Sequence, residues 1–373
     1  MDKIFLPEWK RAVIKVGSSI VAPFGTGCST NYLLSIAQFI IESVHKGKEI
    51  VLVSSGAVAA GYSTRQNKNG NTSFSIPEKQ ALASIGQPLL MEIWSRLFDF
   101  RCAQILITYD AIKNRNRFIN ARNTINELLK LNVLPIVNEN DTVSVDELKV
   151  GDNDNLAAHV AVISEADLLI ICSDIDGLFS DNPNKNKKAT LIKEVVKIDK
   201  SIYEIAGGSS NPLARGGMYT KIQAAEKATA RGISTIIVNG KKKESFDEML
   251  KGVLPGTIFK PKNNPVAAKK HWITHALKTC GTVTVDEGAE KAILKKGASL
   301  LPSGIISVEG NFSHGDAIEI INKENKSFAK GIAQYDSSDM LKIKGLKSKD
   351  IQTVLGFFQS EEIIHRNDLI ILE

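Results

Sequence analysis

Cysteine is scarce in this sequence of 373 residues, and long hydrophobic runs are absent. The four cysteines lie far apart and form no Cys-x-x-Cys pair, which argues against both a disulfide framework and a zinc site. No apolar stretch approaches the roughly 18 to 20 residues that span a bilayer. Residues 1–19 lack the basic segment, apolar run and cleavage site of a secretory signal. We therefore expect a cytoplasmic protein that does not bind a membrane.

Several motifs of catalysis and ligand binding are missing as well. The phosphate loop Gly-x-x-x-x-Gly-Lys-Ser/Thr is absent, and no Gly-x-Gly-x-x-Gly follows an expected strand, so P-loop NTPases and dinucleotide oxidoreductases are not supported. EF-hand spacing and the Gly-x-Ser-x-Gly nucleophile elbow are also lacking. The six histidines form no metal-ligand pattern, and we expect no metal site made of protein side chains alone. His159 lies in an apolar helical pattern, where a packing role is the simpler interpretation.

Charge is unevenly distributed along the chain. The net charge is +6, but residues 278–373 carry 12 Lys and Arg against 14 Asp and Glu. A basic first part suits anionic substrates such as ATP and a dicarboxylate. The acidic balance of the last part argues against a strong phosphate-binding surface, and therefore against RNA binding.

Short runs of Val, Ile and Leu alternate with longer helical patterns in the first 260 residues. Expected strands cover 12–16, 49–55, 104–108, 133–138, 166–174 and 234–240, and an expected helix covers 31–45. Such runs, separated by helices, are typical of a mainly parallel sheet covered on both faces. The first part is therefore predicted to be a three-layer α/β sandwich.

The pattern changes after residue 278. Short expected strands at 281–286, 304–310, 316–322 and 328–335 are separated by Gly, Asn and Asp turns. They predict a small β-rich, barrel-like domain. Residues between the two parts are rich in Pro, Asn and Lys, as linkers often are. We expect domains at 1–260 and 278–373, joined by a linker at 261–277.

Two expected strands end in small residues. Ile14–Ser19 places Lys15 inside an apolar strand with glycine and hydroxyl residues at its exit, and a buried lysine needs an anion. Val53–Gly61 ends a strand in Ser-Ser-Gly and then begins a helix of very small residues, whose N-terminus can bind an anion. The alternatives are a lysine that reaches water along the strand and a tight packing turn.

The densest polar segments are Asn138–Asp141 and Lys149–Leu156. Asn and Asp favour turns, so these could be ordinary loops. However, Gly151–Asn155 opens an apolar helix, so that one Asx residue can cap the helix while others project toward a common site. Amides can bind the carboxylate and ammonium of an amino acid. Acidic side chains can position metal or catalytic groups.

Two further segments suit phosphoryl transfer. Ser173–Phe179 follows the apolar run Leu168–Cys172. Arg215–Lys221 provides glycines for close backbone approach and a lysine in the first turn of the next helix. Glycines and a lysine of this kind can stabilise a phosphoryl group during transfer. The lysine runs at 185–188 and 241–243 are more simply explained as solvated loops.

Taken in order, these motifs resemble those of the amino acid kinase superfamily, and within it the bacterial glutamate 5-kinases. The resemblance is carried by Ile14–Ser19, Val53–Gly61, Asn138–Ala158, Ser173–Phe179 and Arg215–Lys221. Residues 284–305 and 308–320 look like the PUA domain that many of these kinases carry. The resemblance implies an amino acid kinase-like fold followed by a PUA-like barrel. It also implies ATP-dependent phosphorylation of L-glutamate to γ-glutamyl phosphate, the first step of proline biosynthesis.

The same resemblance implies roles for individual residues. Lys15 and Lys221 would neutralise charge on the transferring phosphoryl group, and Asp154 would organise the two lysines. Glutamate would bind to Ser55, Asp141 and Asn153. ATP with Mg²⁺ would bind to a larger set, consisting of Lys15, Gly17, Gly56, Ser173, Asp174, Arg215, Gly216, Gly217, Met218, Tyr219, Thr220 and Lys221. The substrate carboxylate is itself the nucleophile, so no strong general base is required.

Two residues depart from the pattern of the family. Ser173 stands where threonine is common, and Arg215 stands where many relatives have a smaller residue. Arg215 either adds a phosphate contact or crowds the nucleotide. A homo-oligomer and feedback inhibition by proline are implied by the family alone. The alternatives are another acceptor, such as acetylglutamate, aspartate or carbamate, and an RNA-binding protein built on the PUA-like domain.

Overall fold

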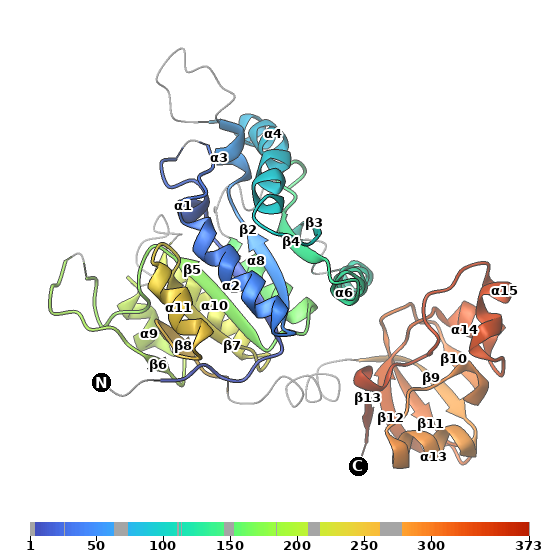
Figure 1. The fold of residues 1–373 in the computed structure, drawn as a ribbon. Coiled ribbons are helices and arrows are strands. Elements are labelled where there is room, and N and C mark those ends of the chain that lie inside the picture. Colours follow the sequence, from blue (N-terminus) through green and yellow to red (C-terminus); the bar gives the residue numbers. More distant parts are fainter. Residues whose placement is uncertain are drawn as a thin grey trace. The chain divides into compact units, whose positions relative to one another are not determined.

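The computed structural model describes residues 4–25, 27–62, 74–109, 112, 114–144, 153–183, 185–207, 217–261 and 278–372. The chain folds into two compact units, Met1–Pro265 and Val266–Glu373 (Figure 1). Their boundary falls within the expected linker at 261–277, which lies outside the described residues from 262 onward. No helix in the described part of the chain is both long enough and apolar enough to span a membrane. All four cysteines are free thiols.

The first unit is built on an eight-stranded sheet with the order β3-β4-β2-β1-β5-β7-β8-β6. The strands are β1 (Arg11–Val16), β2 (Glu49–Ser54), β3 (Cys102–Ile107), β4 (Leu134–Glu139), β5 (Leu168–Ser173), β6 (Glu194–Val195), β7 (Ser234–Asn239) and β8 (Thr257–Phe259). Every pairing is parallel except that of β7 with β8. The mainly parallel sheet and all six expected strands are confirmed.

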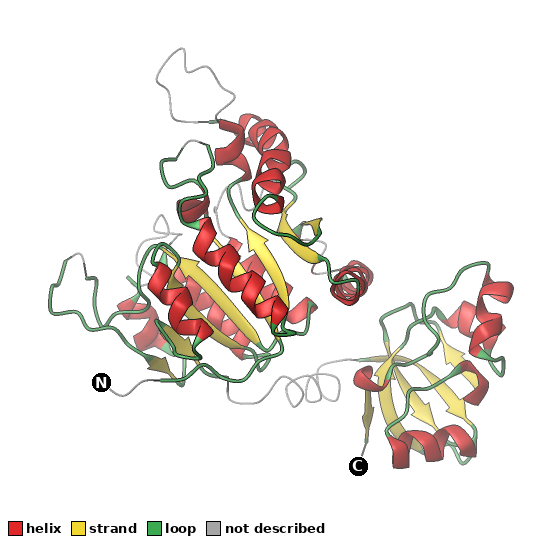
Figure 2. Ribbon diagram, viewed as in Figure 1, coloured by secondary structure: helices red, strands yellow, loops and turns green. Residues whose placement is uncertain are grey.

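Helices cover both faces of this sheet, which gives three layers (Figure 2). They are α1 (Ser18–Val21), α2 (Leu33–His45), α3 (Ala57–Tyr62), α4 (Ile76–Ser95), α6 (Arg115–Lys130), α8 (Asn153–Ile163), α9 (Lys200–Ile205), α10 (Met218–Thr229) and α11 (Lys243–Leu250). Because side chains alternate along a strand, Ile14 faces the core shared with α2, α4 and α11, whereas Val13 faces the core shared with α6, α8 and α10. Burial on both faces explains why these strands are continuous apolar runs.

Helices α3 and α4 approach each other unusually closely. A Cβ atom at Gly86 would lie 1.8 Å from the carbonyl oxygen of Ala57, and one at Gly61 would lie 2.0 Å from the carbonyl oxygen of Leu82. No side chain fits at either position, so glycine is what allows this contact. Helix α4 begins with a capping box between Ser75 and Glu78.

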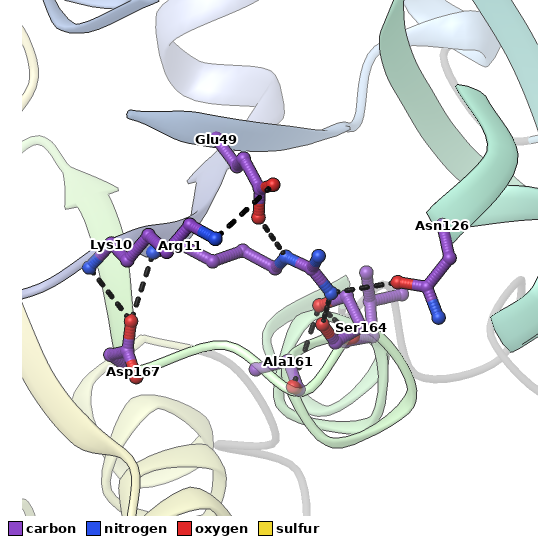
Figure 3. Close-up of polar contacts among 8 residues, drawn as sticks. Lys10, Arg11, Glu49, Asn126, Ala161, Ser164 and Asp167 are labelled. Atoms are coloured by element: carbon purple, nitrogen blue, oxygen red, sulfur yellow. Dashed lines mark hydrogen bonds and ion pairs between the residues drawn. The ribbon is translucent and has the colours of Figure 1, made fainter. Parts of the chain in front are cut away.

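A polar cluster around Arg11 lies at the amino-terminal ends of the central strands and joins them to one another (Figure 3). The Arg11 side chain donates from Nε to Glu49 on β2 at 2.7 Å and from Nη1 to Asn126 on α6 at 2.8 Å. It also donates to the carbonyl oxygen of Ser164, which follows α8. The backbone N–H groups of Lys10 and Arg11 donate to Asp167 just before β5. The cluster therefore ties β1 to β2, α6, the end of α8 and the start of β5.

The second unit contains a five-stranded mixed sheet with the order β10-β9-β11-β12-β13. Its elements are β9 (Thr279–Val285), α13 (Glu287–Lys296), η2 (Pro302–Gly304), β10 (Ile305–Gly310), β11 (Ala317–Ile321), β12 (Ser327–Ile332), α14 (Ser337–Ile343), η3 (Ser348–Asp350), α15 (Ile351–Leu355), η4 (Arg366–Asp368) and β13 (Leu369–Ile371). The four expected strands are present, and β13 is a fifth that was not predicted. The unit has its own apolar core, which includes Val283, Ile318 and Tyr335.

Candidate active site

The polar motifs of the first unit meet at one edge of its sheet. Strands β4, β2, β1 and β5 are consecutive neighbours and all run in the same direction. Their carboxyl ends therefore lie side by side, as do the motifs that follow them. The N-terminal turns of α8 and α10 carry the remaining candidates, Asn153, Asp154 and Met218 to Lys221. This edge is where open α/β sheets bind their ligands.

Two lysines share one buried carboxylate at this edge. The Nζ of Lys15 lies 2.6 Å from Oδ1 of Asp154, and the Nζ of Lys221 lies 3.0 Å from Oδ2. All three residues are almost completely buried, with exposed fractions of 6% for Lys15, 1% for Asp154 and 8% for Lys221. Two ammonium groups against one carboxylate leave a surplus positive charge, which suits an anionic ligand.

The environment of Asp154 keeps it ionised. Burial by itself raises the pKa of Asp154, but the nearby charges of Lys15 and Lys221 outweigh burial and hold the pKa well below its ordinary value. The position in the first turn of α8 also favours a negative charge. The hydroxyl of Thr220 lies 2.9 Å from Asp154 Oδ2 and donates to it. Asp154 is therefore a fixed anion between two cations.

Helix α10 starts in a conformation that brings Lys221 back to this carboxylate. Its N-cap residue, Gly217, has a φ of 81°, which side-chain-bearing residues rarely adopt. The carbonyl oxygen of Gly217 accepts from Lys221 Nζ at 3.3 Å and from the Thr220 hydroxyl at 3.1 Å. Tyr219 packs against Tyr203 with ring centroids 5.2 Å apart. Two other candidates of this segment, 215 and 216, lie outside the described residues.

The glycines after β1 and β2 are placed where backbone must come close. A Cβ atom at Gly17 would lie 3.3 Å from the Nζ of Lys15. Gly56 has a φ of 111°, and a Cβ atom there would lie 2.7 Å from a methyl carbon of Val21. The backbone N–H of Ser55 donates to the carbonyl oxygen of Val16 at 3.0 Å, so the two loops are joined. In the loop after β2, Gly56 is therefore required for tight packing, which was one of the two interpretations of this motif. Tight packing at Gly56 is compatible with an anion site at the same loop.

Of the candidates for binding glutamate, Asp141 and Asn153 lie after β4 and at the start of α8, and Ser55 directly follows β2. Asn153 is the first residue of α8, and its Nδ2 donates to Asn138 Oδ1 at 2.8 Å. Asp141 follows β4, and its partial burial raises its pKa to about 6. Among the described residues, no hydrogen bond joins Ser55, Asp141 and Asn153 to one another. The candidates for phosphoryl transfer, Lys15, Asp154 and Lys221, are therefore in direct contact in the structure, whereas the three candidates for glutamate binding are not joined by hydrogen bonds.

The loop after β5 carries the remaining candidates. Ser173 is buried at the end of β5, and its hydroxyl donates to Asp174 Oδ1 at 3.3 Å. Two residues later, Asp176 accepts from Asn239 Nδ2 and from Lys242 Nζ, both at 2.8 Å. These bonds fix the loop against the exit of β7 and the N-terminus of α11.

His159 plays no part in this cluster. It packs edge-on against Tyr109, with ring centroids 5.6 Å apart. Burial, with a contribution from Lys227 and Arg231, lowers its pKa to about 4, so the ring is neutral at pH 7. The packing role predicted from the sequence is confirmed.

The sequence did not identify Gln87 or the role of Asn138 within this region. Asn138 Nδ2 donates to Gln87 Oε1 at 2.9 Å, and both side chains are buried. Gln87 lies on the face of α4 that is otherwise formed by Leu82, Ala83, Leu90 and Trp94. An amide at helical spacing within an apolar face was a usable signal, because a buried amide requires partners.

Comparisons with known proteins identify the family of this chain. Residues 10–239 match the family model "Amino acid kinase family", and residues 281–355 match the model "PUA domain". Among solved structures, the UMP kinase from Bacillus anthracis aligns with a TM-score of 0.46 and 14% identity, over 69% of this chain and 98% of that chain. The glutamate 5-kinase of Salinibacter ruber is 53% identical, and the alignment covers 100% of both chains. The glutamate 5-kinase of Idiomarina loihiensis is 49% identical over 98% of this chain and 99% of its own. The chain therefore belongs to the amino acid kinase family, with the glutamate 5-kinases as its relatives and a PUA domain after the kinase domain.

Proposed function

We propose that this protein transfers the γ-phosphoryl group of ATP to the side-chain carboxylate of L-glutamate, giving ADP and γ-glutamyl phosphate. Membership of a kinase family implies the use of ATP. The names of the full-length relatives supply glutamate as the acceptor. The observation that carries the proposal is the buried bridge from Lys15 through Asp154 to Lys221, because a surplus positive charge held away from water suits phosphoryl transfer. This reaction is the first step of proline biosynthesis.

In the proposed reaction a carboxylate oxygen of glutamate attacks the γ-phosphorus. The bond from that phosphorus to the bridging oxygen of ADP breaks as the new bond forms. Lys15 and Lys221 would stabilise the negative charge on the transferring group, and Asp154 would hold the two ammonium groups in place. No proton has to leave the nucleophile. The neutral, packed state of His159 is consistent with a reaction that needs no histidine base.

We assign glutamate binding to Ser55, Asp141 and Asn153. The carboxylate of Asp141 is suited to the substrate ammonium group, and Asn153 offers an amide at the start of α8. An acceptor whose amino group is acetylated would lose the ion pair with Asp141. Discrimination against N-acetylglutamate therefore follows from this assignment.

We assign ATP to the loops after β1, β2 and β5 and to the start of α10. The residues are Lys15, Gly17, Gly56, Ser173, Asp174 and the segment 215–221. Mg²⁺ usually binds to substrate phosphates plus one or two carboxylates rather than to a cage of protein ligands. The residues fit this arrangement, because Asp174 places one carboxylate directly after β5, on a loop assigned to ATP. Asp174 would supply a carboxylate oxygen, and the ion would neutralise phosphate charge.

The direct test is trapping of the acyl phosphate with hydroxylamine. Purified full-length protein is incubated with ATP, Mg²⁺ and either glutamate, aspartate or N-acetylglutamate. We expect hydroxamate with glutamate only, and omission of Mg²⁺ should abolish it. Hydroxamate with another acid would move the assignment to that acceptor. No hydroxamate with any acid would contradict the proposal and favour the RNA-binding alternative.

The family suggests further properties that we retain as proposals. These are a homo-oligomeric state, feedback inhibition by proline and a cytoplasmic location. Strong RNA binding by the PUA domain is not expected, because residues 278–373 carry more acidic than basic residues. Tight, salt-sensitive binding of structured RNA by a 280–373 fragment would reverse this expectation.

A further inference from the structure

A chain of four side-chain amides runs from the proposed glutamate site through the protein. Asn153 Nδ2 donates to Asn138 Oδ1 at 2.8 Å, and Asn138 Nδ2 donates to Gln87 Oε1 at 2.9 Å. Gln87 Nε2 in turn donates to Gln104 Oε1 at 3.0 Å. The chain thus connects α8, β4, α4 and β3. Three of the four side chains are buried, with exposed fractions of 7% for Asn153, 2% for Asn138 and 8% for Gln87.

The direction of the chain is set by a backbone group. The backbone N–H of Glu139 can only donate, and it donates to Asn138 Oδ1 at 2.9 Å. The Nδ2 group of Asn138 must therefore face Gln87, which presents its carbonyl oxygen. On the other side, Asn153 must present Nδ2 to Asn138. The carbonyl oxygen of Asn153 is consequently turned away from Asn138, where it can accept a hydrogen bond from a ligand.

Gln87 is itself held in a fixed position. It follows Gly86, where a Cβ atom would lie 1.8 Å from the carbonyl oxygen of Ala57, too close for any side chain. Ala57 begins α3, directly after Ser55 and Gly56. The helix that carries Gln87 is thus packed closely against the helix that starts at the proposed substrate loop.

We propose that Gln87 is a positioning residue for the amino-acid substrate: through Asn138 it holds the Asn153 amide with the carbonyl oxygen available to a substrate ammonium group. This rests on the proposed binding of glutamate by Asn153. Without the acceptor on Gln87, the Nδ2 group of Asn138 would be buried with one hydrogen bond fewer. Asn138 would then rotate or recruit water, and Asn153 would lose its fixed orientation.

The test compares three variants of the full-length protein in the acyl phosphate assay. Gln87→Met keeps the length of the side chain but removes its acceptor. Gln87→Glu restores an acceptor for Asn138. Gln104→Met removes only the outer amide, which lies on the exposed side of β3, and serves as the matched control. KM is measured for glutamate and for ATP, together with kcat and the unfolding temperature.

We expect Gln87→Met to raise KM for glutamate about tenfold, with kcat and KM for ATP within about twofold of the wild type. For Gln87→Glu and Gln104→Met, KM for glutamate and KM for ATP should both stay within about threefold of the wild-type values. A Gln87→Met enzyme with unchanged KM for glutamate, or with equal increases for both substrates, would overturn the proposal, since a merely structural role predicts no preference. If Gln87→Met does not fold, Gln87→Ser gives the same comparison, because its hydroxyl is too short to reach Asn138. A wild type that forms no acyl phosphate from glutamate would instead overturn the proposed function, and this inference with it.

Discussion

Lys221 is distinguished from Lys227, the other lysine of α10, by the residue to which it binds. Its ammonium group is buried against Asp154, whereas that of Lys227, two turns later, donates to the Asn155 side chain at 2.7 Å on the exposed side. Both residues lie on α10 and both interact with the start of α8. Comparing the effects of substituting these two lysines therefore distinguishes a role in phosphoryl transfer from a contribution to the contact between α10 and α8.

We predict that Lys221→Met lowers kcat by at least about a hundredfold, because an ammonium group that stabilises transition-state charge is lost. Lys227→Met should retain kcat within about twofold, since an exposed polar contact contributes little. Both variants should give circular dichroism spectra like the wild type. Equal activities in the two variants would remove Lys221 from the catalytic assignment.

The raised pKa of Asp141 predicts a dependence of glutamate binding on pH. With a pKa of about 6, the carboxyl group is ionised at pH 7.5, half-protonated near pH 6 and neutral below it. Only the ionised form pairs with the substrate ammonium group. We expect kcat/KM for glutamate to fall about tenfold per pH unit below 6. The measurement is kcat/KM between pH 5 and 8, with circular dichroism to show that the protein remains folded.

The control for this prediction is Asp141→Asn. It should have a raised KM for glutamate at every pH, and its profile should be flat across the range in which the wild type changes. A wild-type profile without an inflection near pH 6, or an Asn variant that keeps it, would show that another group titrates.

Residue patterns in the sequence predicted part of this site and missed part of it. Lys15 could be identified because a lysine inside an apolar strand requires an explanation. Its bridge to Asp154 and Lys221 was suggested by the family resemblance, and spacing alone could not reveal it, because Lys221 and Asp154 are 67 residues apart. Gln87 was missed for a similar reason, since its partner Asn138 is 51 residues away on another element.

At the scale of elements, the long apolar strands were predictable and the short ones were not. Strands β1 and β5 are buried on both faces, so that their composition alone identifies them. Strand β6 has two residues and β8 has three, too few for a periodic pattern. The position of β8 next to β7 depends on contacts distant in sequence.

The Arg11 cluster connects several secondary-structure elements, because one side chain joins β1 to β2, to α6 and to the residue after α8. We predict that Arg11→Met lowers the free energy of unfolding by about 2 kcal/mol, since it leaves Glu49 and the Ser164 carbonyl without their charged donor. KM for both substrates should be unchanged, because the cluster lies at the opposite ends of these strands from the site. Urea unfolding and steady-state kinetics provide the two readouts.

Lys10→Met is the matched control for Arg11. The Lys10 side chain is 78% exposed and lies 4.0 Å from the same Glu49 carboxylate. Its loss should change the free energy of unfolding by no more than about 0.5 kcal/mol. If the two variants were equally stable, the hydrogen bonds of Arg11 to α6 and α8 would contribute nothing measurable.

At the scale of the whole molecule, the division of the chain predicts that the kinase domain works alone. All candidate catalytic and binding residues lie in the unit that ends at Pro265, and each unit has its own core. We expect a chain of residues 1–265 to fold and to retain kcat and KM for ATP within about threefold, since it keeps every candidate residue of the site and its own core. A loss of more than tenfold in kcat from a folded fragment would show that the PUA domain takes part in the reaction.

The sequence predicted the two units from the change of pattern near residue 278. The order of strands within each sheet could not be predicted in the same way. Strand β1 pairs with β2 and with β5, which begins more than 150 residues later, so the sheet order depends on contacts that local patterns do not encode. The motifs nevertheless met at one edge because parallel strands place their carboxyl ends together.

The close contact of α3 with α4 limits how this protein can vary. Two glycines, Gly61 and Gly86, cannot gain even a methyl group without driving the helices apart. Sequence drift at either position would therefore displace Gln87 on one helix and the loop of Ser55 on the other together. If a mutant library is selected for phosphorylation of a different acceptor substrate, we expect the selected substitutions at residues around this pair, and we expect Gly61 and Gly86 to remain glycine.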